Sequence, residues 1–209
     1  MTRWYALKLT GITSGIFLLQ VLFPSITDNF ALVAARAWAE PWMFVSAIFL
    51  HANTGHLLLN MFGLALFGSL LEKAVGSKRF LFVYFACGIF ANIVAVNFYP
   101  AALGASGAIF AVLGTLGILR PRMVVWVGYM PMPMWLAIIV WAAIDLLGIF
   151  APSGTANIAH LAGLGSGIVL GFFWRRRYGR ERHGGGKKKV ISDDELRLWE
   201  RKYMQPKKS

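Results

Sequence analysis

The chain is poor in charge and in cysteine for its length. Of its 209 residues only 14% are charged, whereas 57% are hydrophobic. A soluble domain carries about 25% charged residues, so this composition excludes a water-soluble globular fold. The single cysteine, Cys87, excludes an intramolecular disulfide. The first apolar stretch, residues 9–23, lacks the cleavage site of a signal peptide, so we expect it to remain as a membrane helix.

The sequence contains long apolar runs. About 20 apolar residues are enough to cross a bilayer as a helix, and the sequence supplies six segments near this length. We therefore predict an all-α polytopic membrane protein, a bundle of six transmembrane helices. The predicted spans are residues 4–24, 55–74, 80–99, 102–119, 134–150 and 156–174.

The positive charges predict how these spans are oriented. Lys and Arg next to membrane spans stay on the cytoplasmic side. Arg36 is the only such residue in the connections on the other side, so we expect both termini to be cytoplasmic. The residues on the predicted cytoplasmic side are Arg3, Lys8, Lys73, Lys78, Arg79, Arg120, Arg122 and those of the tail.

The chain divides into two predicted parts. Residues 1–174 form the membrane domain, and residues 175–209 form a basic cytoplasmic tail. Within the tail, Ser192 and Glu195 have the spacing of a capping box, which predicts a short helix. Basic residues near the inner leaflet attract anionic lipid, and we interpret the tail as an anchor that fixes the topology.

Two connections are too apolar to be simple solvated loops. Residues 25–54 contain the aromatic residues Phe30, Trp38, Trp42, Phe44 and Phe49, so we expect this loop to lie in the outer membrane interface. Residues 123–133 are apolar and interrupted by two prolines, which indicates an interfacial connection on the inner side.

The buried polar residues are the informative ones in a membrane chain. His56 and Asn60 lie at the start of the second predicted span, Ser106 near the start of the fourth, and His160 near the start of the sixth. All three spans enter from the outside. We therefore expect these four side chains at one depth, in a shallow cavity open to outside water.

The helix faces predict which of these residues meet. On the sixth span, small residues follow His160 on one stripe, and on the fourth span Phe110 and two glycines follow Ser106. Small residues let two helix backbones approach closely, so the pattern predicts that Ser106 and His160 come within hydrogen-bond reach. The stripes are Gly163, Gly167 and Gly171 on the sixth span, and Phe110, Gly114 and Gly117 on the fourth.

This arrangement is suited to acyl transfer. A serine hydroxyl becomes a nucleophile when a base takes its proton, and a neutral His160 can be that base for Ser106. An oxyanion needs hydrogen-bond donors, which His56, Asn60 and the amide of Ser106 can supply. We expect Gly104 and Gly107 to let a substrate backbone approach the serine.

One acid, Asp145, lies well inside a span, and the sequence does not predict which way it faces. We expect a structural hydrogen bond for it and a Ser–His dyad at the site.

Three segments on alternate spans resemble the motifs of the rhomboid intramembrane serine proteases. They are "HANTGHLLLN" (51–60), "GASG" (104–107) and "AHLAGLGSG" (159–167). The resemblance implies that Ser106 is the nucleophile, His160 the general base, His56 and Asn60 the oxyanion residues, and His51 a structural residue. It also implies cleavage of the transmembrane helices of other proteins near their outer ends, after a small residue.

Two positions depart from the family's pattern. The outer loop of the family often has Trp-Arg where this chain has Trp42-Met43. The family often has a tyrosine stacked on the histidine, and here the residue is Phe110, which keeps the ring and loses the hydroxyl.

Other classes of protein fit less well. A zinc protease would need H-E-x-x-H, and His51 and His56 are five apart without a glutamate between them. An aspartyl protease would need a second acid besides Asp145. A transporter or channel, and a catalytically inactive rhomboid-like protein that binds membrane helices, are the alternatives. We expect transmembrane protein substrates, the lipid bilayer, a prokaryotic plasma membrane, no nucleic-acid partner, no metal and no cofactor; the oligomeric state stays open.

Overall fold

The computed structural model describes residues 3–127, 129–151 and 154–178, which are mostly helical. The predicted helical fold is confirmed as a mostly helical one. The prediction "all-α" was wrong in detail, because two small antiparallel strand pairs are present. The helices are α1 (Tyr5–Leu22), α2 (Ser25–Phe30), α3 (Met43–Ser46), η1 (Ala47–Phe49), α4 (Thr54–Gly63), η2 (Leu64–Gly68), α5 (Ser69–Val75), α6 (Ser77–Phe82), η3 (Val83–Cys87), α7 (Gly88–Ala95), α8 (Ser106–Leu119), α9 (Met134–Gly148) and α10 (Asn157–Tyr178). The strands are β1 (Leu32–Val33), β2 (Ala101–Ala102), β3 (Val124–Val127) and β4 (Met130–Pro133).

Four helical stretches of the described residues are long and apolar enough to cross a membrane. They are Tyr5–Leu22, Thr54–Val75, Ser77–Ala95 and Asn157–Arg177. The apolar helices α8 and α9 have 14 and 15 residues. At 1.5 Å per residue they are about 21 and 23 Å long, which is less than a hydrocarbon core of about 30 Å. The chain is therefore a multi-pass membrane protein, and the count of six crossings stays a prediction.

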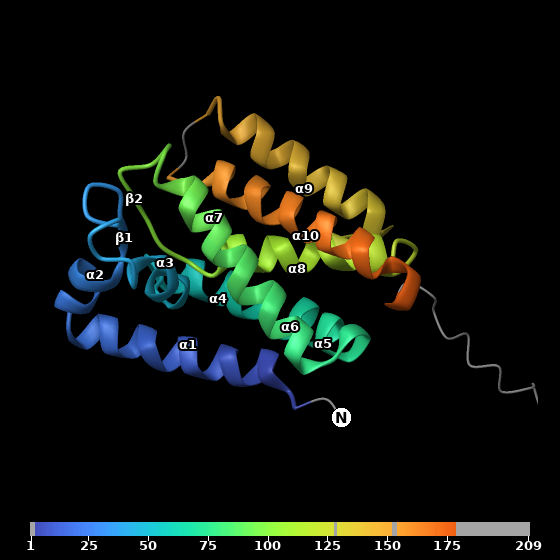
Figure 1. The fold of residues 1–209 in the computed structure, drawn as a ribbon, viewed down its shortest axis with the longest axis horizontal. Helices are drawn as coiled ribbons and strands as arrows, with labels where there is room; N and C mark the ends of the chain where they lie inside the picture. The colour runs from blue at the N-terminus through green and yellow to red at the C-terminus, as the bar shows by residue number, and fades with distance from the viewer. Residues whose placement is uncertain (1–2, 128, 152–153, 179–209) are drawn as a thin grey trace, which may run out of the picture.

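Helix α8 is the centre of the bundle (Figure 1). Ten of its 14 residues are buried, as expected for a helix that is apolar on every side. Helix α10 lies against it at backbone contact, because a Cβ on Gly163 would collide with the carbonyl of Gly107, and one on Gly167 with that of Ala111. The predicted close packing of these two helices is confirmed. Gly117 was wrongly placed on this face, since it meets Ile138 of α9.

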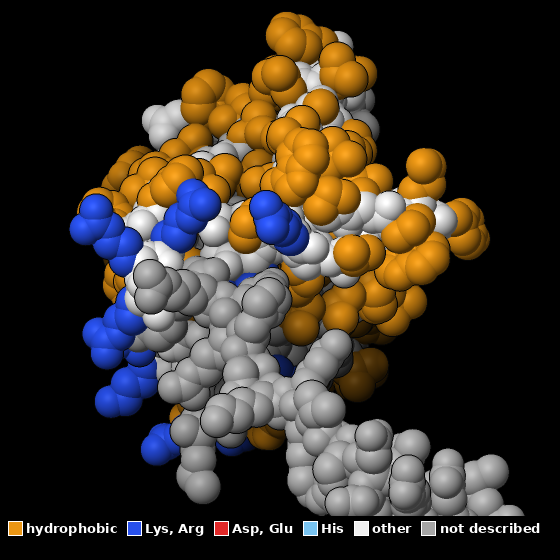
Figure 2. All heavy atoms as spheres, turned by 90° about the vertical axis from the view of Figure 1, so that its right-hand side faces the viewer, with side chains coloured by type: hydrophobic (Ala, Val, Ile, Leu, Met, Phe, Trp, Pro, Cys, Tyr) orange, Lys and Arg blue, Asp and Glu red, His pale blue; other side chains and the backbone are white. Residues whose placement is uncertain are grey.

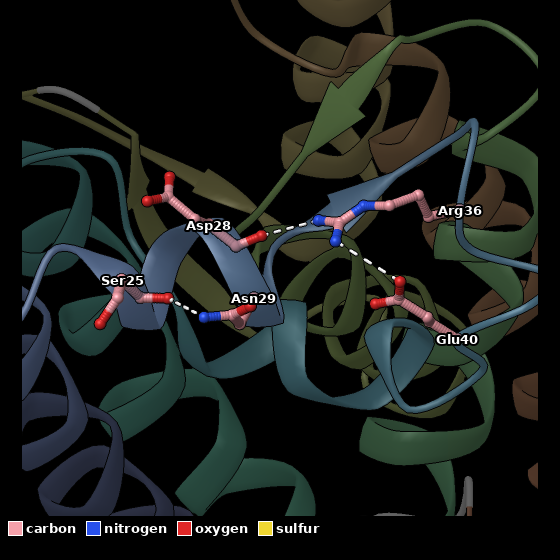
Figure 3. A network of polar contacts seen from close by, with 5 residues as sticks. All are labelled: Ser25, Asp28, Asn29, Arg36 and Glu40. Atoms are coloured by element: carbon pink, nitrogen blue, oxygen red, sulfur yellow. Dashed lines mark hydrogen bonds and ion pairs between the residues drawn. The ribbon is translucent and has the colours of Figure 1, made fainter.

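The loop between α1 and α4 is folded onto the bundle. Strand β1 pairs with β2, so that Leu32 lies opposite Ala102 in the segment before α8. The guanidinium of Arg36 donates to the carbonyl of Asp28 at 2.7 Å and lies 3.4 Å from the carboxylate of Glu40 (Figure 3). Met43 is fully buried. In this chain the contacts of Arg36 and the buried side chain of Met43 therefore stabilise the loop. Met43 stands at the position where the family's pattern has an arginine.

A β-hairpin connects α8 and α9. Strands β3 and β4 pair with Val124 opposite Pro133 and Val127 opposite Met130. Pro131 and Pro133 fit here because both strands of an isolated hairpin are edges, where a missing N–H is tolerated. The apolar connection predicted over residues 123–133 is thus an ordered element of the fold.

The two ends of the bundle differ in charge. The start of α1 and the end of α10 lie at the same end of the molecule (Figure 1), where Lys and Arg side chains gather along the rim (Figure 2). We call this the basic end; the last turn of α10, with Arg175, Arg176 and Arg177, belongs to it. Helices α4, α8 and α10 all begin at the opposite end. Most of the predicted tail, including Ser192 and Glu195, falls in residues 179–209, outside the described residues.

Candidate active site

Ser106 is the first residue of α8, at the end of the bundle opposite the basic end. Its Oγ lies 2.8 Å from Nε2 of His160. The first amide groups of a helix have no partner inside the helix and carry its positive dipole end. The serine is therefore held next to backbone N–H groups that can receive negative charge.

His160 is in the first turn of α10, and three contacts fix its ring. Nε2 faces Ser106, and Nδ1 lies 2.9 Å from Oδ1 of Asp145. Phe110 stacks on the ring, with centroids 4.4 Å apart and an interplanar angle of 12°. The side chain is 11% exposed. The stacking expected from the ring at position 110 is confirmed.

Asp145 is the residue whose place the sequence did not predict. It lies on α9, is buried, and contacts the imidazole on the side opposite Ser106. The sequence could have placed Asp145 at the depth of His160, because Asp145 lies three residues before the end of α9 and His160 three residues after the start of α10. The sequence did not indicate which neighbouring helix Asp145 faces, since α9 is apolar on all its other faces.

His56 lies over Gly104. A Cβ on Gly104 would come within 2.9 Å of Nε2 of His56 and 3.7 Å of the Ser106 hydroxyl, and the φ of +129° at Gly104 also favours glycine. The amide of Ala52 donates to Nδ1 of His56 at 3.4 Å. The proton of this ring therefore belongs on Nε2, the atom nearest to Gly104.

Asn60 is one turn after His56 on α4 and lines the same cavity. Its amide nitrogen donates to the carbonyl of His56 at 2.9 Å, which leaves one of its two N–H groups for another acceptor. The structure thus brings His56 and Asn60 to the cavity that Ser106 and His160 also line.

Gly107 does not face a substrate path, contrary to the expectation. A Cβ there would lie 2.8 Å from the Cβ of Ala91 on α7 and 3.7 Å from the carbonyl of Ala159. The absence of a side chain at Gly107 lets α7, α8 and α10 pack closely. This packing holds together the two helices that carry Ser106 and His160. Gly104 makes room for His56 next to the Ser106 hydroxyl, and its role in substrate approach stays a prediction.

His51 supports the site from outside the second span. Its backbone N–H donates to Gln20 of α1 at 3.0 Å, and its ring meets that of His56 edge-on at 5.0 Å. Burial, and then the neighbouring His56, lower the pKa of His51 from 6.5 to about 4. The imidazole of His51 is 2% exposed, which agrees with the structural role expected of it.

Ser106, His160, Phe110, His56 and Asn60 line a cavity of about 1350 Å³. Its walls are α4 with Leu59 and Phe62 on one side and α9 with Trp141 on the other, and it extends to Trp126 on the hairpin. The cavity is mainly apolar apart from the groups around Ser106. Within the described residues, no group of three or more His, Cys, Asp or Glu side chains is arranged to hold a metal ion.

The fold and this cavity define a multi-pass helical membrane protein with a serine and a histidine joined at the start of two packed helices. The chain matches the protein-family model "Rhomboid domain" over residues 39–177. It therefore belongs to the rhomboid family, and the resemblance seen in the three motifs is confirmed.

Relatives occur in bacteria and plants. The chain is 35% identical over 169 residues to "Rhomboid protease GluP" of Bacillus subtilis (strain 168), covering 78% of this chain and 30% of that protein. It is 36% identical over 139 residues to "Putative rhomboid protease YdcA" of the same organism, covering 64% of this chain and 67% of that protein. It is 32% identical over 155 residues to "RHOMBOID-like protein 4" of Arabidopsis thaliana, covering 71% of this chain and 39% of that protein. The chain thus spans about a third of the length of GluP and RHOMBOID-like protein 4.

Proposed function

We propose that the protein is an intramembrane serine endopeptidase that cleaves the transmembrane helices of other membrane proteins near their outer ends. The observation that supports this most directly is the 2.8 Å contact between Ser106 Oγ and His160 Nε2 in a large, mainly apolar cavity. Membership of the rhomboid family and a relative named "Rhomboid protease GluP" agree with this proposal.

The chemistry follows from the positions of the side chains. The Ser106 hydroxyl gives its proton to Nε2 of His160, and its oxygen bonds to the carbonyl carbon of the scissile peptide. The carbonyl electron pair moves to oxygen, where Nε2–H of His56, Asn60 and the amide of Ser106 are the donors. The C–N bond breaks as His160 returns the proton to the leaving nitrogen. Water then gives a proton to His160 and bonds through its oxygen to the acyl carbon. The bond to Ser106 Oγ breaks as His160 returns that proton to the serine oxygen.

The cavity suggests how a substrate helix reaches the serine. Leu59 and Phe62 of α4 and Trp141 of α9 offer apolar surface suited to a membrane-embedded segment. A peptide bond inside a helix is already hydrogen-bonded and shielded, so the substrate must unwind locally at the level of Ser106. We place its entry between α4 and α9.

The charge distribution supports a topology. The gathering of Lys and Arg at the basic end favours that end as cytoplasmic (Figure 2). Six crossings of a plasma membrane, with both termini in the cytoplasm and the active site near the outer surface, agree with this orientation.

A cleavage assay in liposomes tests the proposal. The substrate is a single-span protein with an alanine near the outer end of its helix. The native chain should cleave it, and Ser106→Ala and His160→Ala should not. Ser166→Ala is the matched control, because Ser166 is also a half-buried serine but donates to the carbonyl of Gly163 within α10 at 2.8 Å; it should remain active.

Two other outcomes have clear meanings. Equal cleavage by the native chain and Ser106→Ala would indicate a contaminating protease and reject the assignment of Ser106. If no variant cleaves and the substrate still co-purifies with the chain, the protein is a catalytically inactive rhomboid-like protein that binds membrane helices.

A further inference from the structure

We propose that Asp145 is a positioning residue for His160, so that the site works as a Ser–His–Asp triad rather than a dyad. This inference rests on the proposed function. Its basis is a line of two hydrogen bonds across three helices: Oδ1 of Asp145 to Nδ1 of His160 at 2.9 Å, and Nε2 of His160 to Oγ of Ser106 at 2.8 Å.

The carboxylate selects the tautomer of His160. An ionised carboxylate only accepts hydrogen bonds, so Nδ1 of the imidazole must carry the proton that it shares with Asp145. Nε2 is then left with its lone pair toward the Ser106 hydroxyl, as a general base requires. Stacking on Phe110 fixes the plane of the ring, but a stacked ring has no preference between its two nitrogens.

The same contact acts during the reaction. When Ser106 gives its proton to Nε2, the imidazole of His160 becomes a cation. The carboxylate of Asp145 then lies 2.9 Å from the positive ring, in a site where both side chains are nearly buried. Opposite charges attract more strongly there than in water, so the acid stabilises the charged form of the base.

A purely structural role explains Asp145 less well. Its second oxygen, Oδ2, is buried and has no hydrogen-bond partner among the described residues, and an unmade hydrogen bond of this kind destabilises a fold. The contact between α9 and α10 has its own packing, in which Gly148 lies against the side chain of Asn157. An acid within a membrane helix is a functional candidate by default, and here it points at the base.

Three side chains among the described residues contact the ring of His160. They are Ser106 and Phe110 on α8 and Asp145 on α9. His56 on α4 lines the same cavity as His160. Asp145 is the carboxylate among them, so a substitution there removes the negative charge next to the base.

The test compares Asp145→Asn and Asp145→Glu with the native full-length chain in liposomes, by kcat and KM on the single-span substrate. Asp145→Asn keeps the size and removes the charge; we expect kcat to fall at least about a hundredfold while KM stays within twofold. Asp145→Glu keeps the acid and should recover part of the lost rate. Thr115→Val is the control, because Thr115 is fully buried and bonds α8 to Gly167 of α10; it should lower thermal stability and leave kcat unchanged.

A second measurement needs folded protein but no substrate. A proton on Nδ1 bonded to a carboxylate gives a strongly deshielded proton NMR signal. We expect this signal in the native chain and in Ser106→Ala, and its loss in His160→Ala and Asp145→Asn.

The outcomes separate the two proposals. If the native chain cleaves, Ser106→Ala does not, and Asp145→Asn keeps the native kcat, the triad is wrong and the protease stands. Equal loss of kcat in Asp145→Asn and Asp145→Glu, with no deshielded proton in the native chain, would also reject the positioning role. If the native chain does not cleave at all but shows the deshielded proton, the proposed activity fails while the Asp145–His160 contact stands.

Discussion

The ring of Phe110 lies parallel to the imidazole of His160, with centroids 4.4 Å apart. The two side chains come from different helices, α8 and α10, so the stack fixes the plane of the proposed base relative to the helix that carries Ser106. An aromatic contact of this kind contributes about 0.5–1.5 kcal/mol beyond buried area, which corresponds to a change of up to about tenfold in rate.

We therefore expect Phe110→Leu to lower kcat several-fold to about tenfold. Phe110→Tyr restores the ring pattern common in the family and should keep the larger part of the rate. Cleavage of the single-span substrate by the two variants checks this. A loss of kcat as large in Phe110→Tyr as in Phe110→Leu would show that the stack is not what matters at this position.

The packing of α9 against α10 at Gly148 gives a second prediction. A Cβ on Gly148 would lie 2.7 Å from the amide of Asn157, so Gly148→Val should push α9 away from α10 and lengthen the Asp145–His160 contact. Misplacing a catalytic group by about 1 Å can cost a hundredfold in rate, and we expect kcat to fall tenfold or more. Gly165→Ala is the control, because a Cβ at Gly165 meets no atom within 4 Å. Equal kcat in the two variants would contradict the prediction.

The sequence predicted the depth of the site because chain direction alternates between spans. His56, Ser106 and His160 each follow the start of a span that enters from the same side, and this is enough to place them at one level. Periodicity added the faces: Gly163 and Gly167 lie one and two turns after His160, and both contact α8. These two arguments were sufficient to pair Ser106 with His160.

Rotation and irregular segments were not predictable in the same way. Helix α9 is apolar around most of its circumference, so nothing in its pattern shows that Asp145 faces α10. The sequence around Gly107 does not indicate which way the residue faces, and only packing shows that it lies against Ala91. The hairpin of β3 and β4 lies within the apolar run, where the residues of β3 favour a strand but Pro131 and Pro133 of β4 do not.

Glu72 gives a prediction about stability. Its buried carboxylate accepts from the backbone N–H of Ala6 at 3.0 Å and from the hydroxyl of Ser77 at 2.6 Å, and so ties the start of α1 to α5 and α6. Glu72→Ala leaves these donors unpaired and should lower the free energy of unfolding by about 1–3 kcal/mol. The exposed Lys78→Ala is the control.

Glu72 lies toward the basic end, away from Ser106. The kcat of the Glu72→Ala molecules that remain folded should therefore equal the native value. Thermal unfolding followed in detergent, together with kcat per folded molecule, checks both statements. A large fall in kcat without a fall in stability would contradict this interpretation of Glu72.

His51 makes stability depend on pH. Its pKa is lowered from 6.5 to about 4 in the folded chain, so between these values the unfolded chain binds a proton that the folded chain does not. Stability contributed by the neutral ring is therefore complete above pH 6.5 and is lost as the pH falls toward 4, by roughly 3 kcal/mol in total. His51→Phe keeps a ring that cannot titrate and should lose less stability over this range. Unfolding temperatures of the two chains between pH 7 and pH 4 give the answer, and parallel curves would assign the acid sensitivity to other groups.

The far end of the cavity gives a prediction about substrates. Trp126 of β3 lines the cavity that also contains Ser106 and His160, and it is 68% exposed. If a substrate helix lies between α4 and α9, its inner half reaches this side chain, whereas a short peptide bound at Ser106 does not. Trp126→Ser should therefore raise KM for a full-length transmembrane substrate several-fold, leave kcat nearly unchanged, and leave the cleavage of a short peptide unaffected.

Tyr129→Ser is the matched control, because Tyr129 is an aromatic residue of the same hairpin that is 98% exposed and outside the residues that line the cavity. An equal rise in KM for both variants would mean that the hairpin acts through its contact with lipid, and an equal effect on peptide and transmembrane substrate would mean that Trp126 acts on the site itself.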